Sequence, residues 1–485
     1  MRLTSTSPSS AVRHTEAGGG RRVPVAWFFA AVVVLIGFIA ANWSRYGASE
    51  PGIWLAPMPF VLHGILQSER IHRGAGYWLL MGFGSINLTI NPILSCFLGS
   101  DLQFLPWEAS QSSRMELTLM YVLAFLGAVG GYLFVVPTTR RIDRRRVPAL
   151  GPEVFLGLGL IGTLLRLQGM GGVSAYVSGT DAMGNAPAGS AGLVGLAMTI
   201  LPPFWVVGCV LVWERHQDFY VGVRRLILFL VAVPAMGFYS YNRAAIVVSF
   251  ASLLLASLST KVKPLRRPIL GLLMAGLALV TWLWGEWRRV LLATQGGSLS
   301  LEQAGVAGGG SSVWDVWQVY TGAPARAAVA LEIMAARPAT LLSSVVGAVP
   351  SLGQTWRPTS GPVVFNMALY GSGGSADQIL PAVVEAHASV PWVGPIILFF
   401  LVGLLLRRFE PGLRGSLPTE GYAGWYMCIW FGAAFVFSVS VVLQIVVFFF
   451  VPFIVLGVWG TMEAAMSSRL GMPSASTKGS SVPRG

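Results

Sequence analysis

Charge is what this sequence has least of. Asp, Glu, Lys and Arg together make up 11% of its 485 residues, whereas soluble globular chains contain about a quarter. Hydrophobic residues make up 54% of the chain, and its mean hydropathy is +0.66. This composition excludes an ordinary soluble enzyme. It predicts an all-α polytopic membrane protein.

Cysteine is also scarce, and several common motifs are missing. The three cysteines, Cys96, Cys209 and Cys428, lie in different hydrophobic segments with no spacing typical of a metal site. No GxxxxGK[ST] phosphate loop occurs, so the chain is not an ATP-driven pump on its own. The predicted outer loops contain no acidic pair with metal-like spacing. We therefore expect neither a metal ion nor a cofactor.

Long apolar runs divide the chain into membrane spans. A span needs roughly 20 apolar residues, and we predict about twelve transmembrane helices. Their predicted ranges are 24–43, 53–67, 77–98, 116–137, 148–165, 192–213, 226–241, 243–259, 268–286, 391–406, 421–440 and 443–461.

The distribution of positive charge orients these spans. With twelve spans, 24 of the 33 Lys and Arg residues fall on one side and nine on the other. Retained positive charge marks the cytoplasmic side, so both termini are expected in the cytoplasm and the protein in the cytoplasmic (inner) membrane. The same rule accounts for the pI near 10.1 without a nucleic-acid partner.

The nine positive residues predicted outside are all arginine. They are Arg45, Arg114, Arg166, Arg243, Arg288, Arg289, Arg326, Arg337 and Arg357. A guanidinium binds phosphate or carboxylate through two parallel hydrogen bonds, which a lysine ammonium does not. Arginines above the outer leaflet therefore indicate a substrate that carries phosphate.

One predicted outer loop, 287–390, is far longer than the others and precedes the tenth span. Within it, residues 313–349 are expected to form one or two helices interrupted at Arg337-Pro338, and Gln378–Ala388 another. Long, partly structured loops in compact proteins are usually functional. We predict a membrane domain over 24–465 with this loop as an extracytoplasmic cap. Short cytoplasmic tails are expected at 1–23 and 466–485, the latter without fixed structure.

Several of the outer arginines are candidates for anion binding. Arg243 follows the tight turn between two spans, where charge is costly unless it faces water, a partner or a ligand, and Tyr241 and Asn242 beside it add hydrogen-bond donors. Arg288 and Arg289 close the ninth span. Arg166 stands where the fifth span ends, ahead of a glycine run that would let the backbone approach a ligand. Arg357 belongs to a Pro-rich basic stretch of the long loop.

Glu385 and His387 lie just before the tenth span, with apolar residues around them. Ionisable groups in that position are functional by default. Because the two are two residues apart, a regular helix turns them to different sides. Either side chain is a candidate general base, while a solvated pair at the membrane interface is the structural alternative.

Four stretches resemble the Wzy-type polymerases of O-antigen and exopolysaccharide repeat units, which belong with O-antigen ligase-like membrane glycosyltransferases. Phe238–Ile246 is similar to that family's hairpin tip, which ends in Arg before the next span. Gly169–Tyr176 is similar to its Gly-Gly loop followed by an aromatic residue. Two stretches of the long loop also match: Ala336-Arg337-Pro338 through Trp356-Arg357-Pro358, and Leu380–Gly394.

This resemblance implies a metal-independent oligosaccharide polymerase at the outer face of the cytoplasmic membrane. Its substrates would be oligosaccharides on undecaprenyl pyrophosphate, with the pyrophosphate at headgroup depth. Glu385 or His387 would deprotonate the acceptor sugar, and Arg243 would offset charge on the departing pyrophosphate. A flippase and a chain-length regulator of the same pathway would be its partners.

Other readings of the sequence stay open. A ligase-like transferase uses the same donor with another acceptor, and His387 would suit either enzyme. A lipid-linked oligosaccharide transporter (flippase) would need charged groups along its spans, which are nearly free of charge here. A non-enzymatic membrane scaffold is a further alternative.

Overall fold

The computed structural model describes a little under half of the chain. The described residues are 52–68, 74–98, 109–135, 151–169, 193–215, 248–249, 251–253, 255–256, 324–336, 341–348, 356–370, 380–410 and 418–469.

Within these ranges the regular structure is entirely helical. The membrane-domain elements are η1 (Ile53–Leu55), α2 (Met58–Ser68), α3 (Ala75–Ser85), the π-helical η2 (Ile86–Ile90), α4 (Asn91–Leu98), α5 (Gln111–Phe134), α6 (Pro152–Gly169), α8 (Leu193–Ile200), α9 (Pro202–Arg215), α19 (Val393–Phe409), α20 (Pro418–Gly432), η6 (Ala433–Phe435) and α21 (Val439–Arg469). The long-loop elements are α14 (Pro324–Ala336), α15 (Leu341–Gly347), η4 (Arg357–Thr359), α17 (Gly361–Tyr370) and α18 (Ala382–Ser389).

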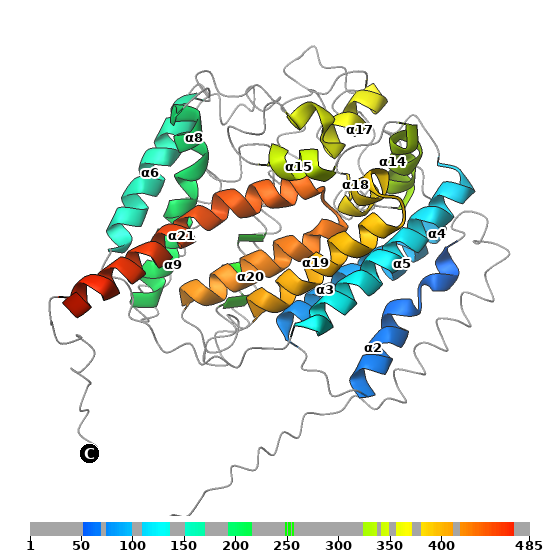
Figure 1. Ribbon diagram of the computed structural model, residues 1–485, viewed down its shortest axis with the longest axis horizontal. Helices are drawn as coiled ribbons and strands as arrows, with labels where there is room; N and C mark the ends of the chain where they lie inside the picture. The colour runs from blue at the N-terminus through cyan, green and yellow to red at the C-terminus, as the bar shows by residue number, and fades with distance from the viewer. Residues whose placement is uncertain are drawn as a thin grey trace, which may run out of the picture.

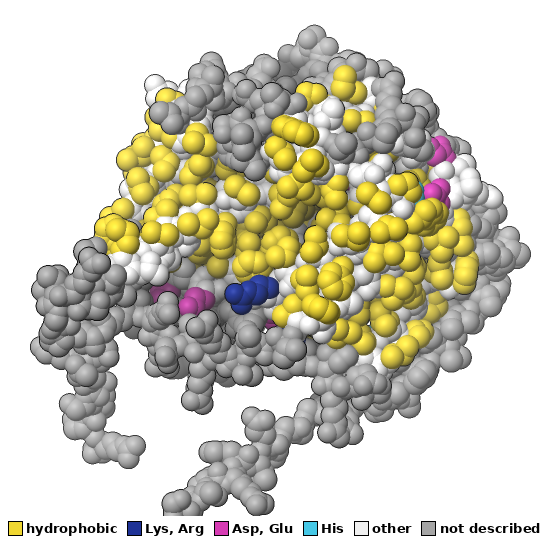
Figure 2. Space-filling view, viewed as in Figure 1, with side chains coloured by type: hydrophobic (Ala, Val, Ile, Leu, Met, Phe, Trp, Pro, Cys, Tyr) yellow, Lys and Arg dark blue, Asp and Glu magenta, His cyan; other side chains and the backbone are white. Residues whose placement is uncertain are grey.

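Within the described ranges, four helices are long and apolar enough to cross a membrane. They cover Ala75–Cys96, Gln111–Phe134, Val194–Val212 and Val439–Trp459. Figure 2 shows the corresponding surface: on the face drawn, apolar side chains form a broad band, and the described charged side chains lie at its lower and upper-right edges. The expected all-helical membrane fold is thereby confirmed at this level, and the number twelve stays a prediction.

The membrane helices pack as a bundle with the long-loop helices over one end. Helix α5 packs mainly on α19, α20 lies beside α19 and α3, and α6 packs on α9. Figure 1 shows α3, α5, α19 and α20 running roughly parallel, with α6, α8 and α9 grouped apart from them and α21 crossing between. Helices α14, α15, α17 and α18 gather along the upper edge; we call them the cap helices.

A seam of glycines brings α5 and α19 into backbone contact. A Cβ placed on Gly131 of α5 would collide with the carbonyl of Phe400, and one on Gly403 of α19 would collide with the carbonyl of Ala128. Gly127 is nearly as tight, because its Cβ would lie 2.6 Å from the carbonyl oxygen of Ile396. Lipid chains are as apolar as leucine, so helices in a membrane associate through close packing of this small-residue kind.

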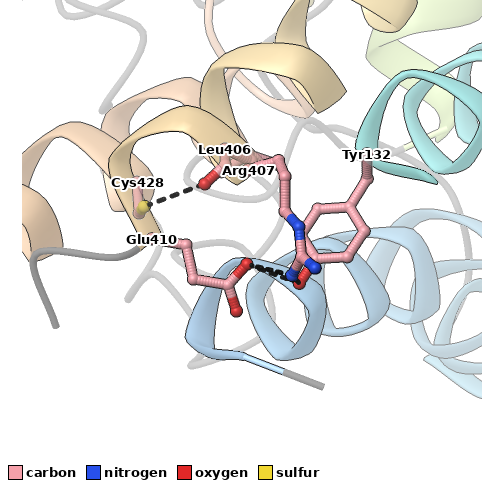
Figure 3. A network of polar contacts seen from close by, with 5 residues as sticks. All are labelled: Tyr132, Leu406, Arg407, Glu410 and Cys428. Atoms are coloured by element: carbon pink, nitrogen blue, oxygen red, sulfur yellow. Dashed lines mark hydrogen bonds and ion pairs between the residues drawn. The ribbon is translucent and has the colours of Figure 1, made fainter. Parts of the chain in front are cut away.

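The opposite end of the same helix pair holds a buried polar network (Figure 3). Arg407 Nη1 donates to Glu410 Oε2 at 2.8 Å and to the Tyr132 hydroxyl at 2.7 Å, and that hydroxyl donates to Glu410 Oε2 at 2.5 Å. The guanidinium also lies over the Tyr132 ring, 4.7 Å from its centroid. A buried ion pair holds only when both partners stay matched, so this network fixes α5 against the end of α19.

The helix ends fall into two sets. Tyr132, Arg407 and Glu410 meet where α5 and α19 end. The starts of α5, α19 and α21 meet the cap helices, through Ser110, Trp392 and Val439. Helices α5 and α19 therefore run in the same direction, and the predicted threading through the membrane stays a prediction.

The described helices refine several predicted boundaries. Helix α5 begins at Gln111, five residues before the predicted start of its span, so Arg114 lies in its first turn and is buried rather than in a loop. The predicted interruption at Arg337-Pro338 is confirmed, because α14 ends at Ala336 and α15 begins at Leu341. The predicted spans 421–440 and 443–461 correspond to separate helices, but the break between them comes earlier than predicted, because α20 ends at Gly432 and α21 begins at Val439.

The glycine seam makes a matched pair of variants informative. Gly131→Ala should destabilise the protein by roughly 1–3 kcal/mol, because its methyl group meets backbone that does not yield. Gly130→Ala is the control, because its Cβ would meet only Phe400 Cδ2, at 3.8 Å. This variant should be as stable as the wild type or more stable, since alanine is about 1 kcal/mol more favourable than glycine inside a helix. Thermal melting in detergent should separate the two. Equal melting temperatures would show that the seam does not hold the pair.

Candidate functional site

Ionisable side chains gather where the cap helices meet the start of α5, the start of α21 and the turn between α18 and α19. We call this place the cap junction. The backbone joins there as well, since the N–H of Ala382 at the start of α18 donates to the carbonyl of Phe437 at 3.0 Å. Helices α5, α19 and α21 thus begin close together beside α14, α15, α17 and α18.

Glu385 lies at the centre of the cap junction with none of its surface exposed. Its Oε1 accepts hydrogen bonds from the Ser344 hydroxyl of α15 and, at 3.2 Å, from the backbone N–H of Gly361. Its Oε2 accepts from the backbone N–H of Val439 at 3.0 Å. One carboxylate therefore joins α15, α17, α18 and α21.

The two backbone donors to Glu385 are the first residues of helices. Gly361 begins α17 and Val439 begins α21, and the first N–H groups of a helix have no partner within it. They also carry the positive end of the helix dipole, which favours a carboxylate. Position 361 requires glycine for steric reasons, because a Cβ there would lie 2.6 Å from Glu385 Oε1.

Burial dominates the proton affinity of Glu385. Removal from water raises the pKa of the carboxyl to about 7, even though the N–H groups of Val439 and Gly361 act in the opposite direction. The protonated form is compatible with the same surroundings, because its O–H can donate to the Ser344 oxygen. The cap junction therefore holds both protonation states near neutral pH.

His387 faces another way from Glu385, as its spacing predicts. Its Nδ1 accepts the backbone N–H of Trp392 at 3.2 Å. Its Nε2 lies 3.4 Å from Glu116 Oε1 on α5. Since Nδ1 is an acceptor, the neutral ring carries its proton on Nε2, directed at Glu116. Burial lowers the pKa of His387, and the charge of Glu116 opposes that effect.

Trp392, between α18 and α19, has a positive backbone φ of 61°. It is the only non-glycine residue with positive φ in the described ranges. Its indole is 42% exposed and stands edge-on to His387, with ring centroids 5.3 Å apart. A bulky residue in this region is strained by about 1–3 kcal/mol and persists only where its surroundings hold it.

A second glutamate of the cap helices, Glu332, contacts the start of α5. Glu332 of α14 accepts the backbone N–H of Ser110 at 2.7 Å, and Ser110 itself caps α5 through Ser113. Although burial acts to raise it, the pKa of Glu332 is lowered by hydrogen bonds from Ser110 and Ser113 and by the charge of Arg114. Glu332 therefore stays ionised and binds α14 to α5.

The predicted site residues fall in different places. The structure brings Glu385 and His387 to the cap junction, whereas Arg166 is buried in the last turn of α6, which Figure 1 draws well apart from α18. Arg357 begins η4, but its side chain is outside the described part of the structure. Tyr241, Asn242, Arg243, Arg288 and Arg289 also lie outside the described residues, so the anion pocket that they would form stays a prediction.

Sequence reasoning missed Glu116 and Ser344. Glu116 stands at the predicted border of a span, and an acid there is typical of a solvated helix end. Ser344 is one of several serines in the long loop. Neither has a local motif, because each acquires its role through a partner that is distant in sequence.

Comparison of the chain with profiles of known protein families, with curated proteins and with solved structures gave no match. A function must therefore be argued from the cap junction and from the sequence.

The raised pKa of Glu385 predicts how stability depends on pH. The folded state binds the proton more tightly than the unfolded chain, whose carboxyl titrates near 4.5. This contribution to stability is complete below pH 4.5 and is lost as the pH rises through 7, by about 3 kcal/mol in all. Melting temperatures measured from pH 4.5 to 8 should fall accordingly.

Two substitutions isolate that effect. Glu385→Gln can donate to Ser344 and accept from Val439, so it should fold and lose the part of the pH dependence that Glu385 causes. Glu385→Leu should be destabilised at every pH, since it leaves buried N–H groups unpaired at about 1–3 kcal/mol each. An unchanged pH profile in Glu385→Gln would assign the titration to another group.

Proposed function

We propose that this protein is a metal-independent membrane glycosyltransferase that polymerises polyprenyl-pyrophosphate-linked oligosaccharide repeat units into a surface polysaccharide. It does so at the outer face of the cytoplasmic membrane, with about twelve spans, both termini inside and the cap helices outside. The observation that carries the proposal is the cap junction, where ionisable side chains and the starts of three membrane helices converge.

The helix starts favour a phosphate-bearing substrate. The starts of α5 and α21 already meet Glu332 and Glu385, whereas no described side chain caps the start of α19; the positive end of the α19 dipole would therefore favour a substrate anion. At headgroup depth this is where the pyrophosphate of a lipid-linked substrate lies. Arginines 243, 288, 289 and 357 would complete the anion site by two-point contacts.

The chemistry needs a base and a stabilised leaving group. A base near the cap junction takes the proton of an acceptor hydroxyl, and that oxygen attacks the anomeric carbon of the donor. The bond from this carbon to the pyrophosphate breaks, and its electron pair leaves with the pyrophosphate, where the arginines offset the charge. Exposed aromatic side chains such as Trp356 and Trp392 offer flat faces to sugar rings.

Orientation is tested by reporter fusions. Fusions at residue 143, in the basic loop after the fourth predicted span, and at residue 350, in the long loop, should report opposite sides of the membrane. The fusion at 143 should be cytoplasmic. The same side for both would contradict the threading on which the proposal depends.

Activity is tested by reconstitution. Purified protein in proteoliposomes with lipid-linked repeat units should yield a ladder of products, since each transfer adds one unit. Arg243→Lys should retain only part of the rate, because lysine keeps the charge but loses two-point binding of phosphate. A single transferred product on an added acceptor, without a ladder, would favour the ligase-like alternative. Movement of the substrate between leaflets without glycosidic products would favour the transporter.

A further inference from the structure

We propose that Glu116 of α5 is the general base of the cap junction and that His387 is the residue that positions it. This inference rests on the proposed function and names the group that would accept the proton from the sugar hydroxyl.

The two candidates from the sequence are both already engaged. Glu385 has no exposed surface, and both of its oxygens accept hydrogen bonds from Ser344, Gly361 and Val439. His387 uses Nδ1 to accept the Trp392 N–H, and its Nε2 faces Glu116. For His387 to take a proton at Nδ1, that hydrogen bond would have to break, because two donors would then face each other.

Glu116 is a partly exposed ionisable group at this place. Its side chain is 37% exposed, against 12% for His387. The other described carboxylates nearby have structural roles. Glu332 accepts a hydrogen bond from the Ser110 N–H, and Glu385 is fully buried. A general base must come within hydrogen-bond reach of its proton, and among the described side chains at the cap junction Glu116 meets this condition.

The surroundings of Glu116 are ordered as a positioned base requires. His387 Nε2 lies 3.4 Å from Oε1 of Glu116, and we assign Oε2 to the substrate hydroxyl. His387 is in turn held by Trp392, which has a positive φ, donates its backbone N–H to Nδ1 and places its partly exposed indole edge-on to the imidazole. A carboxylate and a partly exposed aromatic ring that share one imidazole neighbour suit a sugar, because hydroxyls donate to the oxygens while the apolar ring face stacks on the indole.

The step is balanced within the proposed reaction. Glu116 takes the hydroxyl proton, the hydroxyl oxygen bonds to the anomeric carbon, and the pyrophosphate leaves with the electron pair of the broken bond. The proton on Glu116 then passes to water. His387 keeps its own proton throughout and holds Oε1 in place.

The test compares isosteric variants in the proteoliposome ladder assay, after thermal melting has shown that each is folded. Glu116→Gln should lose about 10²–10⁴-fold in rate, the usual contribution of a positioned base. His387→Gln should lose about tenfold or less, because its amide can accept from Trp392 and donate to Glu116. His387→Ala, which can do neither, should lose more. Glu153→Gln, an exposed acid at the start of α6, is the control.

The pH profile distinguishes a base from a residue that positions one. If Glu116 is the base, the loss of rate on the acid side persists in His387→Gln. If His387→Gln loses as much rate as Glu116→Gln and its acid limb disappears, His387 is the base and the proposal is overturned. A Glu116→Gln rate within about threefold of wild type would overturn it as well.

Two further outcomes are decisive. Should Glu116→Gln fail to fold, Glu116→Asp replaces it, and a wild-type rate from this shortened side chain would refute the proposal, since its carboxylate is withdrawn from the substrate. If the wild-type protein forms no ladder, the proposed function itself fails, and the role of Glu116 fails with it. Failure of the inference alone therefore leaves an active wild type and an active Glu116→Gln.

Discussion

A helix that begins inside a membrane protein leaves backbone N–H groups without partners, and the rest of this structure depends on how they are satisfied. Where such a donor is buried, leaving it without a partner costs about 1–3 kcal/mol. Glutamates from other elements meet this need: Glu385 at α17 and α21, Glu332 at α5, and Glu214 at the Thr419 N–H of α20. Capping within one helix would stabilise that helix only. Capping between elements also fixes which helices are neighbours.

The two ends of the bundle use polar groups differently. At the end away from the cap, Arg407 and Glu410 form an ion pair and Tyr132 completes the network. The two charges there stabilise the packing of α5 on α19. At the cap junction the carboxylates meet helix starts, whose partial charges are fixed in the backbone. The cap junction thus meets its carboxylates with backbone donors, and the charge of Arg114 also acts on Glu332.

The sequence allowed the helical membrane fold to be predicted because the length and composition of apolar runs follow from the bilayer itself. The break at Arg337-Pro338 was also readable, because it depends on local residue chemistry. The different orientations of Glu385 and His387 followed from helix periodicity. Their partners did not, since Val439 and Glu116 are brought to them by packing between distant helices, and no local signal marks a backbone N–H or a border glutamate as a partner.

The same limit applies to the arginines. Because they are arginines and are predicted on the outer side of the membrane, they indicated a phosphate-bearing substrate. That inference uses residue type and predicted side only and does not require knowledge of which residues they contact. Arg114 shows what such an argument lacks, because a shift of five residues in a helix start moves it from a loop to a buried position. Boundary positions depend on capping, here by Ser110 and Glu332, and capping by a distant glutamate is not visible in the local sequence.

The carboxylate of Glu385 has a consequence for the order in which the chain is made. Synthesis runs from the N-terminus, so Ser344, Gly361 and Glu385 all exist before Val439 does. Until the last long helix has been translated, one oxygen of this buried group lacks its backbone donor. The joint between the cap and the bundle is therefore completed only late in biogenesis, and a nascent chain that stops short of α21 carries a buried carboxylate that lacks one of its backbone donors.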